Sequence, residues 1–358
     1  MTTSTAGYVA TGAELSAALR RLAAFRPGSP VLSLYLDLDP TEFPNPRARH
    51  SAITSLLDAA HKEVEDSGTD HAGKESLRSD LQRAAEFFGE SSPKGARGVA
   101  LFSATLAEFF ETIPLPRPTR MWKWIDDSPF VAPLVAAADT RDWLIVVVDA
   151  RHSRMLHGNP ERVEELEKVT DSVPGRHEGS GPTDYQRWVE HLVDQHLERV
   201  AKEADAHLRT ERYQHLLVGG PTEIAPRFES ELSAAARERL AGRFPVELGR
   251  TSPDEIRRAA LSCFEQEERL HERAALDLLI ARLGRNTRAV AGMDDVRDVL
   301  LQSRVELLLF EERLEFAVPA AIESLVKEAI AQSAEILPVR HFSEELALRG
   351  SVAALLRF

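Results

Sequence analysis

The sequence predicts an α/β protein of three domains. Its 358 residues exceed the usual length of one domain, and 43% of them are apolar, which is enough for each domain to bury its own core. Short apolar runs typical of strands alternate with longer segments that have the 3.6-residue period of helices. We place the domains at residues 1–127, 128–265 and 266–358.

The first domain is predicted to mix helices and strands. Residues 31–37 follow Pro30 and alternate as a half-buried strand does, and a glycine-containing break at 89–97 separates the helices from two later apolar runs. Its expected elements are a helix at 12–25, a strand at 31–37, helices near 48–66 and 74–88, a strand pair at 99–102 and 108–113, and an extended, proline-rich edge at 114–118.

The second domain opens with a continuous apolar run, residues 143–148, as a buried central strand does. Neighbouring strands are expected at 153–157 and 162–169, followed by a glycine- and proline-rich loop. The next segment predicts a long helix from about Tyr185 to Leu208, because its apolar positions step by threes and fours: Tyr185, Val189, Leu192, Val193, Leu197, Val200, Ala204 and Leu208. After it we expect a strand at 215–218, a helix near 226–240, a short strand around Val246 and a long helix from about Asp254.

The third domain is predicted to begin inside or just after that last helix. Helical and strand patterns alternate through it, which favours another α/β layer. The expected elements are a helix at 293–302, a strand at 305–310, a helix at 319–332 and strands at 336–339 and 351–358.

The composition excludes several classes of protein. No run of 18 apolar residues is present, and that is the length that a membrane helix needs. The first ten residues lack the cationic start and apolar stretch of a secretory signal. The single cysteine, Cys263, excludes an internal disulfide and is typical of a reducing compartment. We therefore expect a cytoplasmic monomer with no membrane contact.

The net charge of −13 argues against a protein that coats nucleic acid by bulk attraction. Residues 1–125 are nearly neutral, with 14 basic and 15 acidic side chains, whereas residues 126–265 hold 18 basic and 26 acidic ones. Any contact with RNA must therefore come from local clusters, such as Arg151 with Arg154 or Arg257 with Arg258.

Three polar constellations have structural explanations. Asp149, at the end of a central strand, invites comparison with two-metal nucleases, but no second inward carboxylate accompanies it, so we interpret it as a turn residue. Asp37 and Asp39 could form a carboxylate pair, and we favour their capping the turn before Pro40. The Gly219-Gly220-Pro221 stretch lacks the spacing of phosphate-binding loops and predicts a tight turn.

No metal or cofactor site is expected. His191 and His196 are five residues apart, so they do not share a helical face as paired ligands would, and Cys263 has no partner thiol for zinc. The aromatic side chains of Trp122, Trp124 and Phe130 predict a seam between domains.

The middle of the chain has a distinctive order: three strands, a glycine-bearing loop, a long helix, then strand, helix, strand and helix. Two further phrases follow, YQHLLVGGP at 213–221 and AVAGMDDVRDVLLQSRVELLLFEERL at 289–314. Together they resemble the central domain and the start of the third domain of the archaeo-eukaryotic peptide-release factors and Pelota. The first 125 residues look like the N-terminal domain of the bacterial branch of that superfamily, which includes Balon-like and Vms-like proteins.

The resemblance implies a central RNase H-like release-factor domain and a third domain with the kink-turn-binding, ribosomal-protein-like α/β fold. In that family the loop before the long helix carries a Gly-Gly-Gln tripeptide, which enters the peptidyl-transferase centre. The corresponding segment here is 170–187, which we expect to be a mobile finger mounted on a rigid helix. The resemblance further implies the ribosome and ribosomal RNA as partners, and a translational GTPase such as elongation factor Tu.

The loop departs from the family pattern, because it contains no Gly-Gly-Gln. Alignment from the long helix places Glu178-Gly179-Ser180 opposite the tripeptide, whereas alignment on Tyr185-Gln186 places Pro182 opposite its glutamine. A serine there keeps the backbone amide that could stabilise developing charge, whereas a proline has no amide hydrogen. The expected RNA-contact residues are His177, Glu178, Gly179, Ser180, Gly181, Pro182, Gln186 and Arg187, with Gly179 and Ser180 catalytic only if the loop is hydrolytic.

Three functions remain open. The favoured one is a ribosome-associated factor that binds the A site in hibernation, rescue or quality control without hydrolysis. The second is a peptidyl-tRNA hydrolase that releases nascent chains through residues 178–182. The third is a divergent scaffold that has lost contact with the ribosome, which the acidic charge favours mildly.

Overall fold

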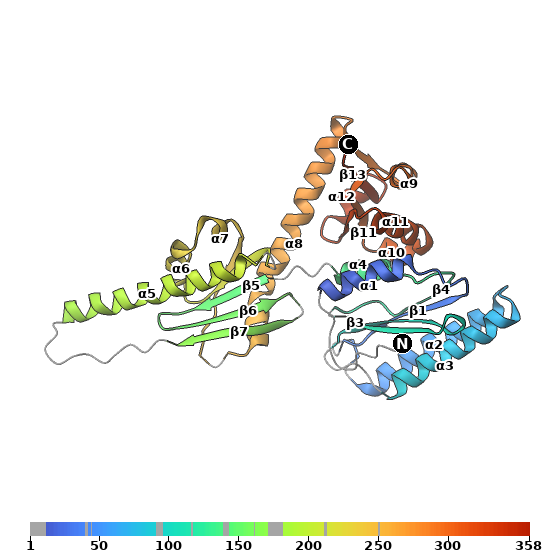
Figure 1. The fold of residues 1–358 in the computed structure, drawn as a ribbon, viewed down its shortest axis with the longest axis horizontal. Coiled ribbons are helices and arrows are strands. Elements are labelled where there is room, and N and C mark those ends of the chain that lie inside the picture. The colour runs from blue at the N-terminus through green and yellow to red at the C-terminus, as the bar shows by residue number, and fades with distance from the viewer. Residues whose placement is uncertain are drawn as a thin grey trace. The chain divides into compact units, whose positions relative to one another are not determined.

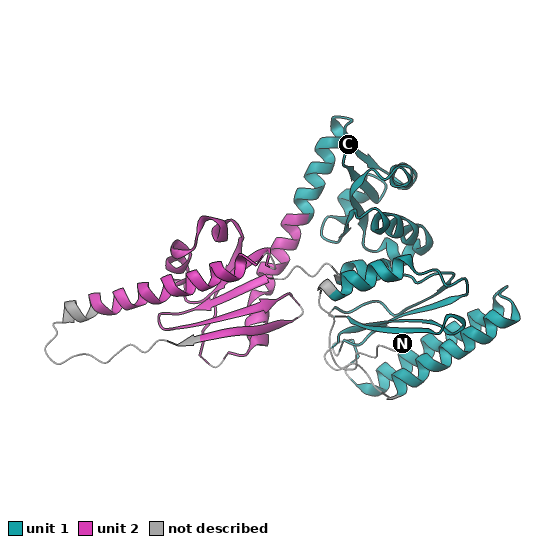
Figure 2. Ribbon diagram, viewed as in Figure 1, with its two compact units in different colours: residues 1–139, 272–358 teal, residues 140–271 magenta. Residues whose placement is uncertain are grey.

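The computed structural model describes residues 12–39, 42–43, 45–90, 96–115, 117–138, 143–160, 162–170, 182–210, 213–249 and 251–358. Three β-sheets with flanking helices make up this part of the chain (Figure 1). The predicted α/β class is confirmed. Two compact units hold the sheets, residues 1–139 with 272–358, and residues 140–271 (Figure 2). The predicted domain boundaries after residues 127 and 265 stay a prediction.

The first sheet is antiparallel, with the strand order β3-β2-β1-β4. Leu32 and Leu34 of β1 point toward α2 and α3, and Tyr35 points to the other face, toward α1 and α4. The elements of this part are α1 (Gly12–Ala24), β1 (Val31–Asp37), α2 (Pro46–Asp66), α3 (His71–Glu90), β2 (Gly98–Ala104), the short 3-10 helix η1 (Thr105–Ala107), β3 (Phe109–Leu115), β4 (Trp122–Asp126) and α4 (Ala132–Ala138).

The second sheet carries the central domain and has the order β7-β6-β5-β8-β9. β5, β6 and β7 pair antiparallel, whereas β8 and β9 continue parallel to β5, which is the arrangement expected of an RNase H-like domain. The strands are β5 (Trp143–Val148), β6 (His152–Gly158), β7 (Val163–Thr170), β8 (His215–Gly219) and β9 (Leu240–Phe244).

The helices of the central domain lie against this sheet. α5 (Pro182–Leu208) packs with α6 (Ala225–Glu231) and α7 (Ala234–Glu238) over one face. The first half of α8 (Pro253–Gly284) packs on the other face through Ile256, Ala260 and Phe264. Ser252 and Glu255 cap the start of α8 reciprocally, because each backbone N–H donates to the other side chain.

Two expectations for the central domain are wrong. The helix predicted near 226–240 is two helices, because Leu232 is extended and Ser233 starts α7, its Oγ accepting from the Ala236 N–H. The last strand lies at 240–244 rather than around Val246. It can lie against α8 there because Gly242 has no side chain, and a Cβ at that position would lie 3.1 Å from the Cys263 Sγ.

The third sheet has the order β10-β13-β11-β12. β11 and β12 are parallel, and β13 is antiparallel to both of its neighbours. The second half of α8 packs on one face through Leu276 and Leu279. The other elements are β10 (Ala289–Ala291), α9 (Met293–Leu301), β11 (Val305–Glu311), α10 (Leu314–Ala317), α11 (Pro319–Ala331), β12 (Glu335–Val339), α12 (Ser343–Ala347) and β13 (Val352–Leu356).

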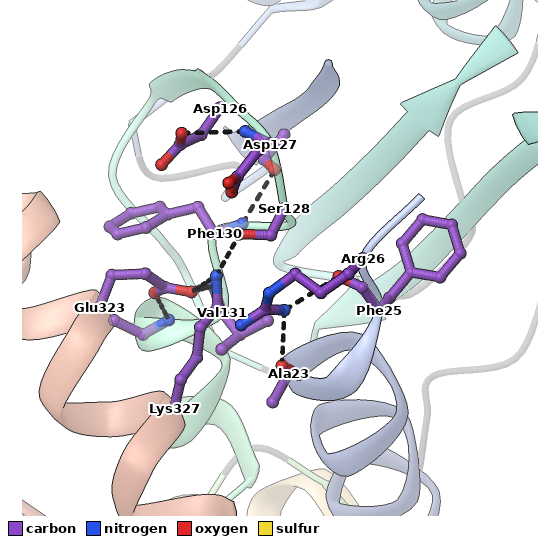
Figure 3. Close-up of polar contacts among 12 residues, drawn as sticks. Ala23, Phe25, Arg26, Asp126, Asp127, Ser128, Phe130, Val131, Glu323 and Lys327 are labelled. Carbon is purple, nitrogen blue, oxygen red and sulfur yellow. Dashed lines mark hydrogen bonds and ion pairs between the residues drawn. The ribbon is translucent and has the colours of Figure 1, made fainter. Parts of the chain in front are cut away.

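The first and third sheets share one unit, and a carboxylate joins them (Figure 3). Glu323 on α11 accepts from the backbone N–H groups of Val131 and Ala132 at the start of α4, at 2.8–2.9 Å. Lys327 pairs with the same carboxylate at 2.9 Å and donates to the Ser128 Oγ at 2.8 Å. Because Glu323 is buried, these partners replace the water that the carboxylate loses on folding.

Candidate functional site

The predicted RNA-contact segment lies between β7 and α5 of the central domain. β7 ends at Thr170 and α5 begins at Pro182. His177, Glu178, Gly179, Ser180 and Gly181 fall outside the described residues. Pro182, Gln186 and Arg187 lie in the first turns of α5, and Arg187 is exposed. Their predicted contact with RNA therefore stays a prediction.

α5 begins three residues before the predicted start at Tyr185. Proline is favoured in the first turn of a helix, because its fixed φ suits the helix and its missing N–H would have no helical partner there. The helix has 27 residues, which corresponds to a length of about 40 Å. α5 is thus a long helix that follows residues 171–181 in the sequence.

The anchored part of α5 is its C-terminal two thirds. Buried side chains begin at Val193 and continue through Leu197, Val200, Ala204 and Leu208, as predicted. The expected stripe is wrong at its start, because Val189 and Leu192 are only partly buried. The first turns of α5 therefore extend past the core of the domain, as Figure 1 shows.

Polar contacts fix α5 to the helices beside it. Asp194 pairs with Arg227 of α6 at 2.6 Å, and Asp205 accepts from the Ser233 hydroxyl at 2.8 Å. Because hydrogen bonds and ion pairs require a specific geometry, these contacts fix the orientation in which α5 packs on α6 and α7. Apolar packing and these polar contacts hold α5 from Val193 to Leu208, and its first turns lie outside that packed part.

Three of the four arginines in the clusters expected to meet RNA make ion pairs within the protein. Arg154 is 6% exposed, its Nε contacts the Glu165 carboxylate at 2.6 Å, and it also donates to the Thr251 carbonyl. Arg257 and Arg258 both pair with Asp254. Arg257 and Arg258 thus share one carboxylate, and Arg151 is exposed, so contact of these clusters with RNA stays a prediction.

Asp149 is a turn residue, as predicted. Its Oδ1 accepts from the backbone N–H groups of Arg151 and His152, each at 2.7 Å, and its carboxylate contacts the His152 ring. The described residues hold no group of three or more His, Cys, Asp or Glu side chains that could bind a metal ion. His191 is exposed and His196 is buried on α5, and burial lowers the pKa of the His196 imidazole.

The other structural interpretations also hold. Gly220 has φ +152°, and a Cβ there would lie 2.2 Å from the Val148 carbonyl oxygen, so this is a tight turn and not a phosphate loop. Asp37 accepts from the Asp39 N–H at 2.8 Å, and Asp39 pairs with Arg97 at 2.5 Å. The two aspartates cap a turn.

The predicted aromatic seam is present in the unit that holds the first and third sheets. Trp122 packs on Phe316 with ring centres 5.3 Å apart, and Trp124 packs on Phe130 at 5.2 Å. The alternating pattern of β4, which carries both tryptophans, was not recognised from the sequence. A cavity of about 620 Å³ adjoins this seam and is lined by Asp37, Arg120 and Glu315, among others.

Two buried carboxylates here, Glu315 and Glu323, were not predicted from the sequence. Burial raises the pKa of Glu315 to about 8, with Glu312 adding to the effect, and burial likewise raises the pKa of Glu323. Both residues occupy apolar positions of otherwise ordinary helices, so nothing in their spacing distinguishes them.

No described helix is long and apolar enough to cross a membrane.

Comparison with known proteins gives a consistent family. Residues 129–265 match the family model described as bacterial archaeo-eukaryotic release factor family 10. The chain is 25% identical over 215 residues to the peptide chain release factor subunit 1 of Methanopyrus kandleri, covering 57% of this chain and 52% of that protein. It is 24% identical over 230 residues to the same subunit of Archaeoglobus fulgidus, covering 61% and 56%.

The chain thus spans just over half the length of these release factor subunits. Among solved structures, the crystal structure of Archaeoglobus fulgidus Pelota is similar, with a TM-score of 0.38 and 16% identity over 73% of this chain and 79% of that one. The matches to the release factor subunits extend beyond the stretch covered by the family model, which is the central domain.

Proposed function

We propose that the protein is a translation factor that binds the ribosomal A site, because residues 129–265 match the bacterial archaeo-eukaryotic release factor family 10. It would act in the cytoplasm in hibernation, rescue or quality control. The ribosome and ribosomal RNA are its proposed partners, with a translational GTPase such as elongation factor Tu as a candidate escort.

One observation carries this proposal. The family match coincides with a sheet of the order β7-β6-β5-β8-β9 and with a helix whose first turns extend past the core. A segment attached to such a helix can extend away from the domain core. Little conformational entropy is lost when it binds, since the helix is already fixed along its buried part. The segment 170–187 is thereby suited to enter a deep cavity lined by RNA.

The proposed contacts with RNA come from His177 to Pro182, together with Gln186 and Arg187. The N-terminal end of a helix presents unsatisfied N–H groups and the positive end of the helix dipole, which favour phosphate. Arg187 adds a full positive charge on the exposed side of α5. We propose that the glycines at 179 and 181 let the backbone approach its target closely.

Binding without hydrolysis is the favoured form of the proposal. The segment reads RHEGSGPTDYQR at 176–187, with no Gly-Gly-Gln. Hydrolysis of peptidyl-tRNA through this segment would have to use backbone amides and a bound water, with Gly179 and Ser180 in place of the tripeptide. This peptidyl-tRNA hydrolase activity is the second candidate function.

Sedimentation tests the first candidate. Cell extracts from growing and from stressed cells are separated on sucrose gradients, and the protein is followed by immunoblot. We expect it in the ribosomal fractions under at least one of the two conditions. Its absence from ribosomal fractions in both conditions would overturn the proposal and favour the scaffold that has lost ribosome contact.

A release assay separates the two candidates. Purified protein is added to ribosomes that carry labelled peptidyl-tRNA, and Gly179→Ala and Ser180→Ala are compared with His191→Ala, an exposed change on α5 that serves as the control. The favoured proposal predicts no release above background by any of the four proteins. Release that falls in the two loop variants and persists in the control would establish the hydrolase instead.

A further inference from the structure

Five arginines gather at one corner of the third sheet. Arg282 and Arg285 lie at the end of α8, and Arg288, Arg304 and Arg357 lie beside the ends of β10, β11 and β13. β13 runs between the other two strands, and the backbone N–H groups of Leu356 and Arg357 donate to the carbonyls of Arg288 and Arg304, each at 2.9 Å. We call this set the arginine corner.

The turn that carries two of these arginines is fixed. After α8, the Asn286 N–H donates to the Leu283 carbonyl at 3.0 Å, and the Thr287 N–H donates to the Arg282 carbonyl at 2.9 Å. Asn286 and Arg288 both have positive φ, which bends the chain back toward β10. Arg285 and Arg288 are thus exposed on a defined turn rather than on a free loop.

Most of the charges in the corner are not cancelled by carboxylates. Arg357 donates to the carbonyls of Gln332 and Ser333, and Arg304 donates to the Gln302 side-chain oxygen and the Phe358 carbonyl. The oxygens of Gln302, Gln332 and Ser333 are neutral, so they orient the guanidinium groups without removing their charge. Among the described contacts of the corner, the one with a side-chain carboxylate is Arg282 to Glu306, at 3.3 Å.

The concentration of cations is unusual for this chain. Its net charge is −13, and residues 266–358 hold 12 basic against 16 acidic side chains. Five like charges at one corner repel each other, which opposes folding unless an anion neutralises them. Elsewhere in the chain many arginines are paired with carboxylates, as Arg257 and Arg258 are with Asp254.

We propose that the arginine corner binds the phosphate backbone of RNA. Guanidinium groups donate two parallel hydrogen bonds to phosphate oxygens, which lysines do not, and all five cations here are arginines. An RNA strand carries a charge at every phosphate, and Arg288, Arg304 and Arg357 lie beside the ends of three neighbouring strands of one sheet. The inference rests on the proposed function in that the RNA would be ribosomal, but the surface lies on a different domain from residues 170–187.

Binding of free RNA tests the corner directly. Full-length protein is titrated into a fluorescent RNA duplex and a fluorescent single strand, and the anisotropy is measured from 50 to about 300 mM salt. The wild type should bind with an affinity that falls steeply with salt. Arg285→Glu with Arg288→Glu should weaken binding about tenfold or more and make the salt slope shallower by about 2.

Two further double variants keep the result interpretable. Arg285→Gln with Arg288→Gln should weaken binding less than the glutamate pair, because no repulsion is added. Arg20→Glu with Arg313→Glu changes the net charge equally at two exposed sites outside the corner and should bind as the wild type does. Circular dichroism checks that each variant folds.

The outcomes separate this inference from the proposed function. Wild-type protein that fails to bind either RNA, or equal losses in the corner and control variants, would overturn the arginine corner and leave ribosome binding standing. Tighter binding to an acidic peptide than to either RNA would replace RNA by a protein partner. Protein that binds free RNA but never enters ribosomal fractions would instead overturn the proposed function.

Discussion

The Glu323 carboxylate receives the backbone N–H of Val131 with both oxygens 2.9 Å away, across 192 residues of sequence. Tyr35 and Ser33 hold the residue before it, because Tyr35 donates to the Phe130 carbonyl at 2.5 Å and Ser33 accepts from the Phe130 N–H at 3.0 Å. Residues 130–132 thus form hydrogen bonds on both sides, with β1 of the first sheet and with α11 beside the third sheet. These contacts link the two sheets.

Removal of that carboxylate should loosen the unit. Glu323→Ala leaves two buried N–H groups without their acceptor and removes the ion-pair partner of Lys327, and we expect it to lower the free energy of unfolding by about 3 kcal/mol. Glu323→Gln retains an acceptor and should cost less than half of that. Glu328→Ala, an exposed change on the same helix, is the control for urea denaturation. Equal midpoints for all three variants would show that the contact is dispensable.

The turn after β8 should tolerate no side chain. Gly220→Ala places a Cβ 2.2 Å from the Val148 carbonyl oxygen at a φ of +152°, so the central strands must move apart. We expect a loss of more than about 2 kcal/mol in thermal unfolding. Gly249→Ala, where a Cβ meets no atom within 4 Å, should unfold within about 0.5 kcal/mol of the wild type. A wild-type unfolding temperature for Gly220→Ala would contradict the turn geometry.

The main elements of the fold were readable from the sequence because their patterns are strong. The continuous apolar run at 143–148 is buried on both faces of its sheet, and the stepped stripe from Val193 to Leu208 buries one face of α5. The break between α6 and α7 was missed, although Ser233 is a typical helix cap, since the apolar periodicity continues across it. Strand order was not predictable, because it depends on which edges meet in space.

The site was less predictable than the fold. Sequence pointed to Arg154 as a surface cation, but burial and an ion pair cannot be read from a residue type. The arginine corner combines residues from 282 to 357, and only the run RLGRNTR at 282–288 hints at it. Its other members come together through the pairing of β10, β13 and β11.

Glu315 should make stability depend on pH. The folded protein holds its proton up to about pH 8, whereas a free glutamate loses it near 4.5, so between these values the folded state binds more protons than the unfolded state. Stability contributed by this group is therefore fully present below about pH 4.5 and is lost as the pH rises through 8, with a slope of up to about 1.4 kcal/mol per pH unit.

Denaturation between pH 5 and 9 measures this dependence. The wild type should lose stability relative to Glu315→Gln as the pH rises, since glutamine cannot ionise. Other carboxyl groups with raised pKa values, such as that of Glu111, contribute equally to both proteins and cancel in the difference. Parallel curves for the two proteins would mean that Glu315 is ionised in the folded state at neutral pH.

Arg154 should matter for stability and not for RNA. Arg154→Ala removes the contacts with Glu165 and the Thr251 carbonyl, and we expect a loss of about 2 kcal/mol in the free energy of unfolding. Its affinity for free RNA should equal that of the wild type, in contrast to the pair at Arg285 and Arg288. An RNA affinity that falls as much as in that pair would restore Arg154 as a contact residue.

Cryo-electron microscopy of ribosomes captured with the tagged protein tests the central claim most directly. The account predicts density for the protein in the A site, with α5 directed toward the peptidyl-transferase centre, residues 177–182 against its RNA wall, and Arg285 and Arg288 beside a phosphate backbone. Captured ribosomes whose A site lacks the protein, or in which α5 points away from the large-subunit RNA, would contradict it.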